Sequence, residues 1–124
     1  MLSVTTWAGL QCGLFAVPKA VATHPWFIAT MFDAYFGFTT FFVWVCFKQA
    51  SWTARIAWFV AIMALGNIAM SSYCLSELSM VPSGGKVADV LTARRNGPGW
   101  LGIALALFGV AVTVAAALVP SPAK

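Results

Sequence analysis

Charged side chains are scarce in this sequence. Its 124 residues include seven Lys and Arg, three Asp and Glu and one His, whereas 61% of the residues are hydrophobic. So few polar side chains cannot cover the surface of a soluble domain of this length. The composition therefore predicts an integral membrane protein. The cations are spread along the chain and give no signal of nucleic-acid binding.

Enzyme motifs are also missing. The three cysteines form no C-x-x-C pair and have no His at metal-ligand spacing, which favours small buried side chains. The stretch "SGGK" lacks both the first Gly and the final Ser or Thr of a phosphate-binding loop. No G-x-S-x-G, H-E-x-x-H or paired-carboxylate pattern occurs. The sequence thus predicts that the protein is not an enzyme and requires no cofactor or metal.

Long hydrophobic runs take the place of the missing charge. A membrane-spanning helix needs about 20 apolar residues, and three segments have that length, 26–47, 54–75 and 100–119. The segment 1–17 is apolar but short, so it is either a minimal span or an interfacial helix. These segments predict an all-α fold, a single membrane domain over 1–124 that forms an integral membrane bundle of three to four transmembrane helices.

The connections set the expected topology. Residues 48–53 are few enough that the segments on either side must form an antiparallel helical hairpin at the centre of the bundle. The connection 76–99 is longer, and "KVADVLTARR" within it has the spacing of a short amphipathic helix. Lys48 and Arg55 flank the short hairpin loop, so we expect that side to face the cytoplasm. A spanning 54–75 helix would place 76–99 on the opposite side.

One acidic residue, Asp33, lies inside the first long segment. In an antiparallel hairpin that closes near residue 50, Asp33 is level with residue 68, which puts Asn67 within reach. The spacing predicts a buried polar layer of Thr30, Asp33, Asn67 and Ser71. Such a layer would act as a structural clamp on the hairpin. The alternative is a protonatable site in a transport path, because an intramembrane carboxylate needs a partner or a proton.

The only histidine, His24, precedes Pro25 at the start of the same segment. A single imidazole can ligate the magnesium of a chlorophyll-type pigment, so His24 is a candidate pigment ligand. A His before Pro at a membrane boundary is more often a solvated helix cap. The many aromatic side chains are compatible with bound lipid or pigment, but most such residues in membrane helices serve packing and the interfacial belt.

The last long segment carries small side chains on one face. At helical spacing these are Gly102, Ala106, Gly109, Thr113 and Ala116. Small residues let helix backbones approach closely, so this stripe predicts a helix-docking face, either within the chain or against another subunit.

Two stretches carry a family resemblance, "SVTTWAGL" and "PWFIATMFDAYFGFTTFFVWVCFKQASWTARIAWFVAIMALGNIAM". They resemble a family of small uncharacterised multi-pass membrane proteins of bacteria and plants, known as a domain of unknown function, over roughly residues 3–78. The shared residues are Trp26, Asp33, Tyr35, Gly37, Lys48, Ser51 and Trp52. The resemblance implies a complete first spanning helix, where this chain has a shorter segment, and it implies that the last helix is an addition. It brings no known activity.

Docking faces without a catalytic constellation favour an accessory subunit. We expect a non-enzymatic protein that stabilises a larger integral membrane complex, such as a respiratory or photosynthetic one, in a bacterial inner or intracytoplasmic membrane. Its partners would be lipids and other membrane subunits, with no nucleic acid. The alternative is a small oligomeric proton-coupled transporter that uses Asp33.

Overall fold

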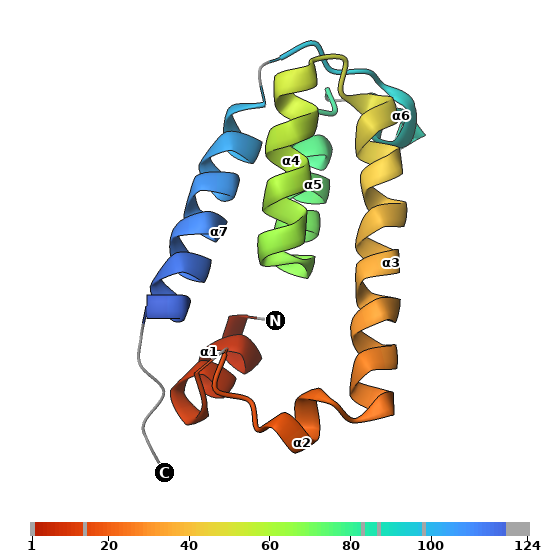
Figure 1. The fold of residues 1–124 in the computed structure, drawn as a ribbon. Coiled ribbons are helices and arrows are strands. Elements are labelled where there is room, and N and C mark those ends of the chain that lie inside the picture. The colour runs from red at the N-terminus through yellow and green to blue at the C-terminus, as the bar shows by residue number, and fades with distance from the viewer. Residues whose placement is uncertain (1, 14, 83, 87, 98, 119–124) are drawn as a thin grey trace.

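The chain is all-helical in the parts that the structure describes. The computed structural model describes residues 2–13, 15–82, 84–86, 88–97 and 99–118 (Figure 1). The elements are α1 (Leu2–Gln11), α2 (Lys19–Ala22), α3 (Pro25–Lys48), α4 (Trp52–Leu65), α5 (Asn67–Ser79), α6 (Ala88–Thr92) and α7 (Trp100–Leu118). Within these ranges the only β-type pairing is an isolated parallel bridge between Gln49 and Arg95.

Helix α3 contains the whole of the expected segment 26–47. Its start is set by Pro25 at the first helical turn, where a missing N–H costs nothing. Its end is set by Gln49, which takes an extended conformation with φ −88° and ψ 119°. With 24 residues the helix is about 36 Å long, enough to cross a bilayer core.

The expected single helix over 54–75 is wrong, because the chain reverses direction at Gly66. Gly66 has φ 54° and ψ −128°, a conformation that side chains with a Cβ rarely adopt. Its N–H donates to Ile62 O at 2.8 Å and ends α4, and its own carbonyl accepts from Met70 N at 3.2 Å and starts α5. The segment is therefore a second hairpin.

The aromatic contacts show how sharply α5 folds back on α4. The rings of Trp58 and Tyr73 are 4.8 Å apart between centroids. In a straight helix these two residues, 15 positions apart, would be separated by about 22 Å. Tyr73 consequently lies inside the bundle, where it is fully buried.

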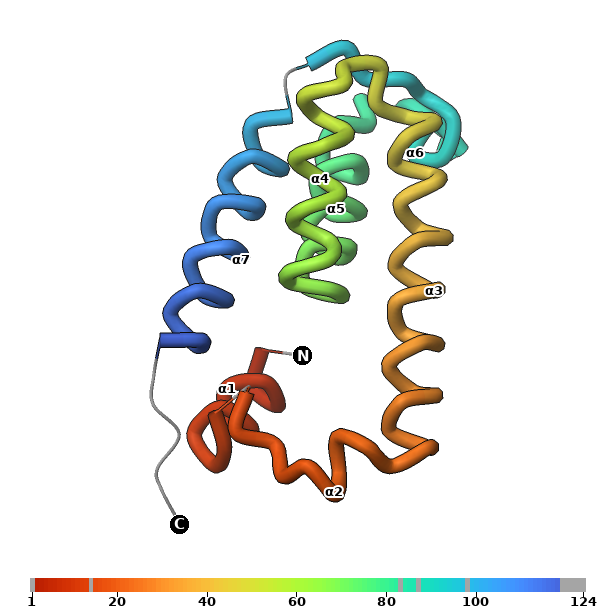
Figure 2. The backbone as a smooth tube through the Cα atoms, viewed as in Figure 1, coloured from red at the N-terminus to blue at the C-terminus, as the bar shows by residue number. Residues whose placement is uncertain are grey.

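Four helices make the bundle, with α4 at its centre. Successive helices α3, α4 and α5 run in alternating directions, and α7 runs parallel to α4 (Figure 2). Helix α4 contacts α3, α5 and α7. The buried core is formed by Val45, Trp58, Ala61, Ile62, Ala69 and Tyr73.

The short helices occupy the two ends of the bundle. Helices α1 and α2 lie at the end where α3 begins and α7 finishes, while α6 lies at the opposite end (Figure 1). Helix α1 has 10 residues, about 15 Å, which is too short to cross a bilayer, and none of its described side chains is buried. Helix α6 lies within the predicted amphipathic stretch, and Val90 is its buried residue.

Two described helices, α3 and α7, are long and apolar enough to cross a membrane. Helix α4 is apolar but has only 14 residues, about 21 Å. The expected third span is thus replaced by the α4–α5 hairpin. The expected segment 100–119 corresponds to α7, and residue 119 lies outside the described residues.

Candidate functional site

The expected polar layer does not form. Asp33 is exposed on α3, and its carboxylate forms no hydrogen bond or ion pair with any other described residue. The Thr30 hydroxyl donates to the carbonyl of Trp26 in its own helix at 2.8 Å. Asn67 and Ser71 are also exposed, on α5. The structural clamp predicted for Asp33 is therefore wrong for this chain.

The turn at Gly66 explains why Asp33 finds no partner. The α3–α4 register agrees with the predicted one near the loop, where the rings of Phe42 and Phe59 lie 5.0 Å apart. The ring of Phe38 then closes over the turn, only 2.7 Å from the place that a Cβ on Gly66 would occupy. Asp33 comes five residues before Phe38, about 7.5 Å along α3 from it, and therefore lies beyond the turn that ends α4.

Asn67 and Ser71 line an open groove instead. The groove has a volume of about 640 Å³, and its walls are Phe41 from α3 with Asn67, Met70, Ser71, Cys74 and Leu75 from α5. Asp33 is not among the lining residues. The structure thus separates the carboxylate from the two polar side chains with which it was expected to bond.

The small-residue stripe of α7 is occupied within the chain. Gly102 and Gly109 are buried. A Cβ on Gly102 would lie 2.9 Å from the Trp58 ring, and one on Gly109 would lie 2.8 Å from Ala64 Cβ. Ala106 packs beside the core, and Thr113 and Ala116 are half-buried. The stripe brings α7 against α4, so it does not supply a surface for another subunit.

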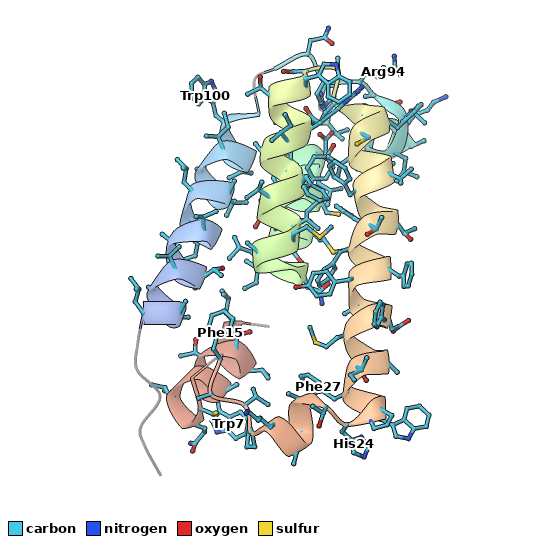
Figure 3. The ribbon with its side chains drawn as sticks, in the orientation of Figure 1. Trp7, Phe15, His24, Phe27, Arg94 and Trp100 are labelled. Carbon is cyan, nitrogen blue, oxygen red and sulfur yellow. The ribbon has the colours of Figure 1, made fainter. Side chains whose placement is uncertain are left out.

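His24 caps α3. Its Nδ1 accepts a hydrogen bond from Trp26 N at 3.3 Å, which satisfies one of the free N–H groups at the helix start. The side chain is exposed at the foot of α3 (Figure 3). Capping uses Nδ1 and leaves Nε2 as the only nitrogen that could ligate a pigment. In the described part of the chain, no three His, Cys, Asp or Glu side chains gather at a site that could hold a metal.

A buried charge cluster of Lys48, Glu77 and Arg95 lies at the other end of the bundle. Lys48 Nζ is 2.6 Å and Arg95 Nε is 3.0 Å from the same oxygen, Glu77 Oε2. The side chains of Lys48 and Glu77 are 0% and 2% exposed, and that of Arg95 is 26% exposed. Lys48 Nζ also donates to the carbonyl of Val90. The two buried charges, on Lys48 and Glu77, are therefore paired with each other. An unpaired charge in an interior of low polarity would be strongly destabilising.

Hydrogen bonds around the charge cluster attach the 90–95 segment to the α3–α4 connection. Arg95 N donates to Lys48 O at 2.8 Å, and Ala50 N donates to Arg95 O at 2.9 Å. Trp44 Nε1 donates to Leu91 O at 3.0 Å. The cluster thus joins α3, α5 and the segment after α6 at one point. Its role is structural, because it holds these three parts of the chain together.

The charge cluster was not predicted from the sequence. Lys48 reads as an interface anchor after an apolar run, and Glu77 as a loop residue beyond the expected span 54–75. The missed signal is that Glu77 lies one helical turn after Tyr73, on the same buried face of α5. Without the reversal at Gly66, nothing brings that face to Lys48.

The charge cluster also corrects the expected topology. Arg95 and the rest of 88–97 lie at the same end of the bundle as Lys48 and Arg55, not at the opposite end. Figure 3 shows Arg94 and Trp100 at this end and His24 at the other. Ser83, which belongs to the 76–99 connection that the expected topology placed on the opposite side, lies outside the described residues.

One protein family matches the chain. The family is described as "Protein of unknown function (DUF1475)", and its model matches residues 11–117. The chain belongs to this family. No curated protein and no solved structure matches the chain.

The matched range extends further than the expected resemblance over residues 3–78. It includes almost all of α7, so the last helix is part of the DUF1475 family pattern and the expectation that it is an addition is wrong. The stretch "SVTTWAGL" precedes the match. The family match thus covers the α3–α7 bundle except for the last residue of α7.

Proposed function

We propose that this DUF1475 protein is a non-enzymatic subunit of an integral membrane complex, such as a respiratory or photosynthetic complex of a bacterial inner or intracytoplasmic membrane. In this proposal α3 and α7 cross the bilayer. The α4–α5 hairpin enters it from one side, with its turn protected because Gly66 is buried in protein. Trp26 begins α3 at one boundary, and Trp52 and Trp100 lie at the other; all three are more than 70% exposed, as interfacial indoles are.

The observation that carries the proposal is the exposed carboxylate of Asp33 on α3. Asp33 lies eight residues after Pro25, about 12 Å along the helix, and has no described partner. A carboxylate near the bilayer centre costs roughly 2.5–3.5 kcal/mol on insertion scales. A neighbouring subunit that presents a cation or hydrogen-bond donor at this depth would offset that cost. Gly37, one turn along, has nothing within 4 Å of the place that a Cβ would occupy and leaves room for a close helix.

A small proton-coupled transporter is the second candidate, and it rests on the same residue. An exposed carboxylate on a spanning helix can bind and release a proton if copies of the chain enclose it. The 640 Å³ groove between α3 and α5 has two polar side chains, Asn67 and Ser71, in a mostly apolar lining, and it does not include Asp33. A transporter would need Asp33 to be connected to a polar path, whereas a subunit interface does not. We therefore favour the first candidate.

Replacing Asp33 with Leu is expected to release the partner. The chain would be isolated from its native membranes in mild detergent with a photo-crosslinking residue at Gly37. We expect a crosslink to one membrane protein, whose attached helix carries a Lys, Arg or amide at that depth, and we expect Asp33→Leu to remove it. The control variant Phe36→Leu changes a 68% exposed side chain on the same helix and should leave the crosslink intact.

The two candidates give different results in this experiment. A crosslink from Gly37 to a second copy of the chain, with proton uptake into liposomes that Asp33→Asn abolishes, would establish the transporter instead. A crosslink that persists at full yield in Asp33→Leu would remove the support for the subunit proposal.

A further inference from the structure

The outer surface of α3 and α4 holds a second, smaller groove near the α3–α4 connection. Its volume is about 210 Å³ and its walls are Phe42, Cys46, Trp52, Arg55, Ile56 and Phe59. Arg55 is the only charged residue among them. The groove therefore combines an apolar wall with one cation, which suits a ligand that has a hydrocarbon chain and an anionic group.

Arg55 is held in place but its charge is not neutralised. Its Nε donates to Gln49 O at 2.7 Å, and its guanidinium lies 5.1 Å from the centre of the Trp52 ring. Among described residues the ion pairs all involve Glu77, and none includes Arg55. No hydrogen bond joins either Nη of Arg55 to a described residue. The planar N–H fork that suits a phosphate thus remains available.

The groove runs from the start of α4 toward the middle of that helix. Trp52, Ile56 and Phe59 follow one face of α4 at helical spacing, over about 10 Å between the first and the last. Trp52 is 73% and Ile56 61% exposed, so the wall faces outward and not into the bundle. In a bilayer, the Arg55 end would lie at headgroup level and the Phe59 end at the level of the acyl chains.

This end of the bundle is basic. Its described residues include five cations, Lys48, Arg55, Lys86, Arg94 and Arg95, and two carboxylates, Glu77 and Asp89. The carboxylate of Glu77 is already paired twice, and that of Asp89 accepts from Lys86 N. Cations that gather at one end of a membrane protein favour the cytoplasmic side, where anionic lipids give the surface a negative potential.

We propose that the α3–α4 groove binds an anionic phospholipid. The phosphate ester accepts hydrogen bonds from the Arg55 guanidinium beside Trp52, and one acyl chain lies along Phe42, Ile56 and Phe59. This inference rests on the membrane placement proposed above. A free phosphate ion could meet Arg55 in the same way, but it would leave the apolar wall unused.

Retention of added lipid in native mass spectrometry tests the site. The full-length protein in detergent would be titrated with phosphatidylglycerol, with phosphatidylcholine of the same acyl chains, and with inorganic phosphate. We expect one tightly retained phosphatidylglycerol and weaker retention of phosphatidylcholine. Arg55→Gln should weaken phosphatidylglycerol binding about tenfold or more, the range of a charge-assisted bidentate contact. Ile56→Ser, at an exposed position of the wall, should weaken both lipids.

The matched control is Arg94→Gln. Arg94 is an exposed cation at the same end, 5.3 Å from the Phe47 ring and outside the groove, so this variant should bind like the unmodified chain. Equal loss in Arg94→Gln and Arg55→Gln would show general charge attraction and overturn the site. Equal retention of both lipids would overturn it as well. If millimolar inorganic phosphate displaced phosphatidylglycerol completely, the Arg55 contact would belong to the free ion.

Failure of this site can be told apart from failure of the membrane proposal. A chain that detergent alone extracts from membranes but that retains no phosphatidylglycerol would overturn the groove and leave the subunit proposal standing. A chain recovered in the aqueous fraction would overturn both.

Discussion

Replacing Glu77 with Leu is expected to lower the free energy of unfolding by about 3–5 kcal/mol, because it leaves Lys48 buried without its counter-ion. Lys48 is 0% exposed and would keep only the carbonyl of Val90 and the Trp44 ring as partners. Arg95 is partly exposed and can turn its charge to water. The free energy of unfolding would be measured by denaturant titration of the purified protein in detergent, with tryptophan fluorescence as the signal.

Two further variants separate the pairing from other effects of the substitution. Lys48→Met combined with Glu77→Leu removes both buried charges, and it should recover much of the lost stability, since apolar replacement of a whole buried pair is often neutral. Asp89→Leu makes the same change at an exposed carboxylate and should cost less than about 1 kcal/mol. If the double variant were as unstable as the sum of its single variants, the two charges would not be coupled.

Replacing Gly66 with Ala is expected to cost about 2–4 kcal/mol. An Ala at φ 54° and ψ −128° is strained by about 1–3 kcal/mol, and its Cβ would also meet the Phe38 ring at 2.7 Å. Removing that ring with Phe38→Leu should relieve the contact but not the backbone strain, so the rescue should be partial. The same denaturant titration measures both variants.

Gly37→Ala is the control for this substitution. Gly37 lies inside α3 and has nothing within 4 Å of an added Cβ. Because Ala is favoured over Gly in a helix by about 1 kcal/mol, this variant should be neutral or slightly more stable. A Gly66→Ala protein as stable as Gly37→Ala would contradict the reversal at Gly66.

The two long helices could be predicted from the sequence because their signals are local. An uninterrupted apolar run bounded by Pro25 and Lys48 matches α3 to within one residue at each end. The run that begins at Trp100 matches α7 over its described length. Length, hydrophobicity and a proline at the start decide such elements without reference to the rest of the chain.

The α4–α5 hairpin could not be predicted in the same way. "ALGNIAM" is apolar almost throughout, and a single Gly inside such a run is compatible with a continuous helix at modest cost. What decides between the two folds is tertiary: Trp58 packs against Tyr73, and Glu77 reaches Lys48 and Arg95. These contacts join residues 15 to 29 positions apart, and no local pattern records them.

Every error about the candidate site follows from that one reversal. The predicted Asp33 layer requires the α3–α4 register to continue to residue 68, but α4 ends at Leu65. A spanning helix over 54–75 would put the segment 88–97 on the far side, whereas the α4–α5 hairpin returns it to the side of Lys48. The prediction that the α7 stripe is a close-packing surface is confirmed, and the structure shows that α4 is the helix that covers it.

Cysteine accessibility in oriented membrane vesicles tests the reversal at Gly66 most directly. In a chain whose Cys12, Cys46 and Cys74 are replaced by Ala, single cysteines would be placed at Ala50, at Asn96 and, as the reference for the other end, at Ala20; all three positions are exposed. A membrane-impermeant maleimide should label Ala50→Cys and Asn96→Cys from the same side, and Ala20→Cys from the other. Labelling of Ala50→Cys and Asn96→Cys from opposite sides would show that residues 54–75 cross the membrane as one helix, and would contradict the fold described for α4 and α5.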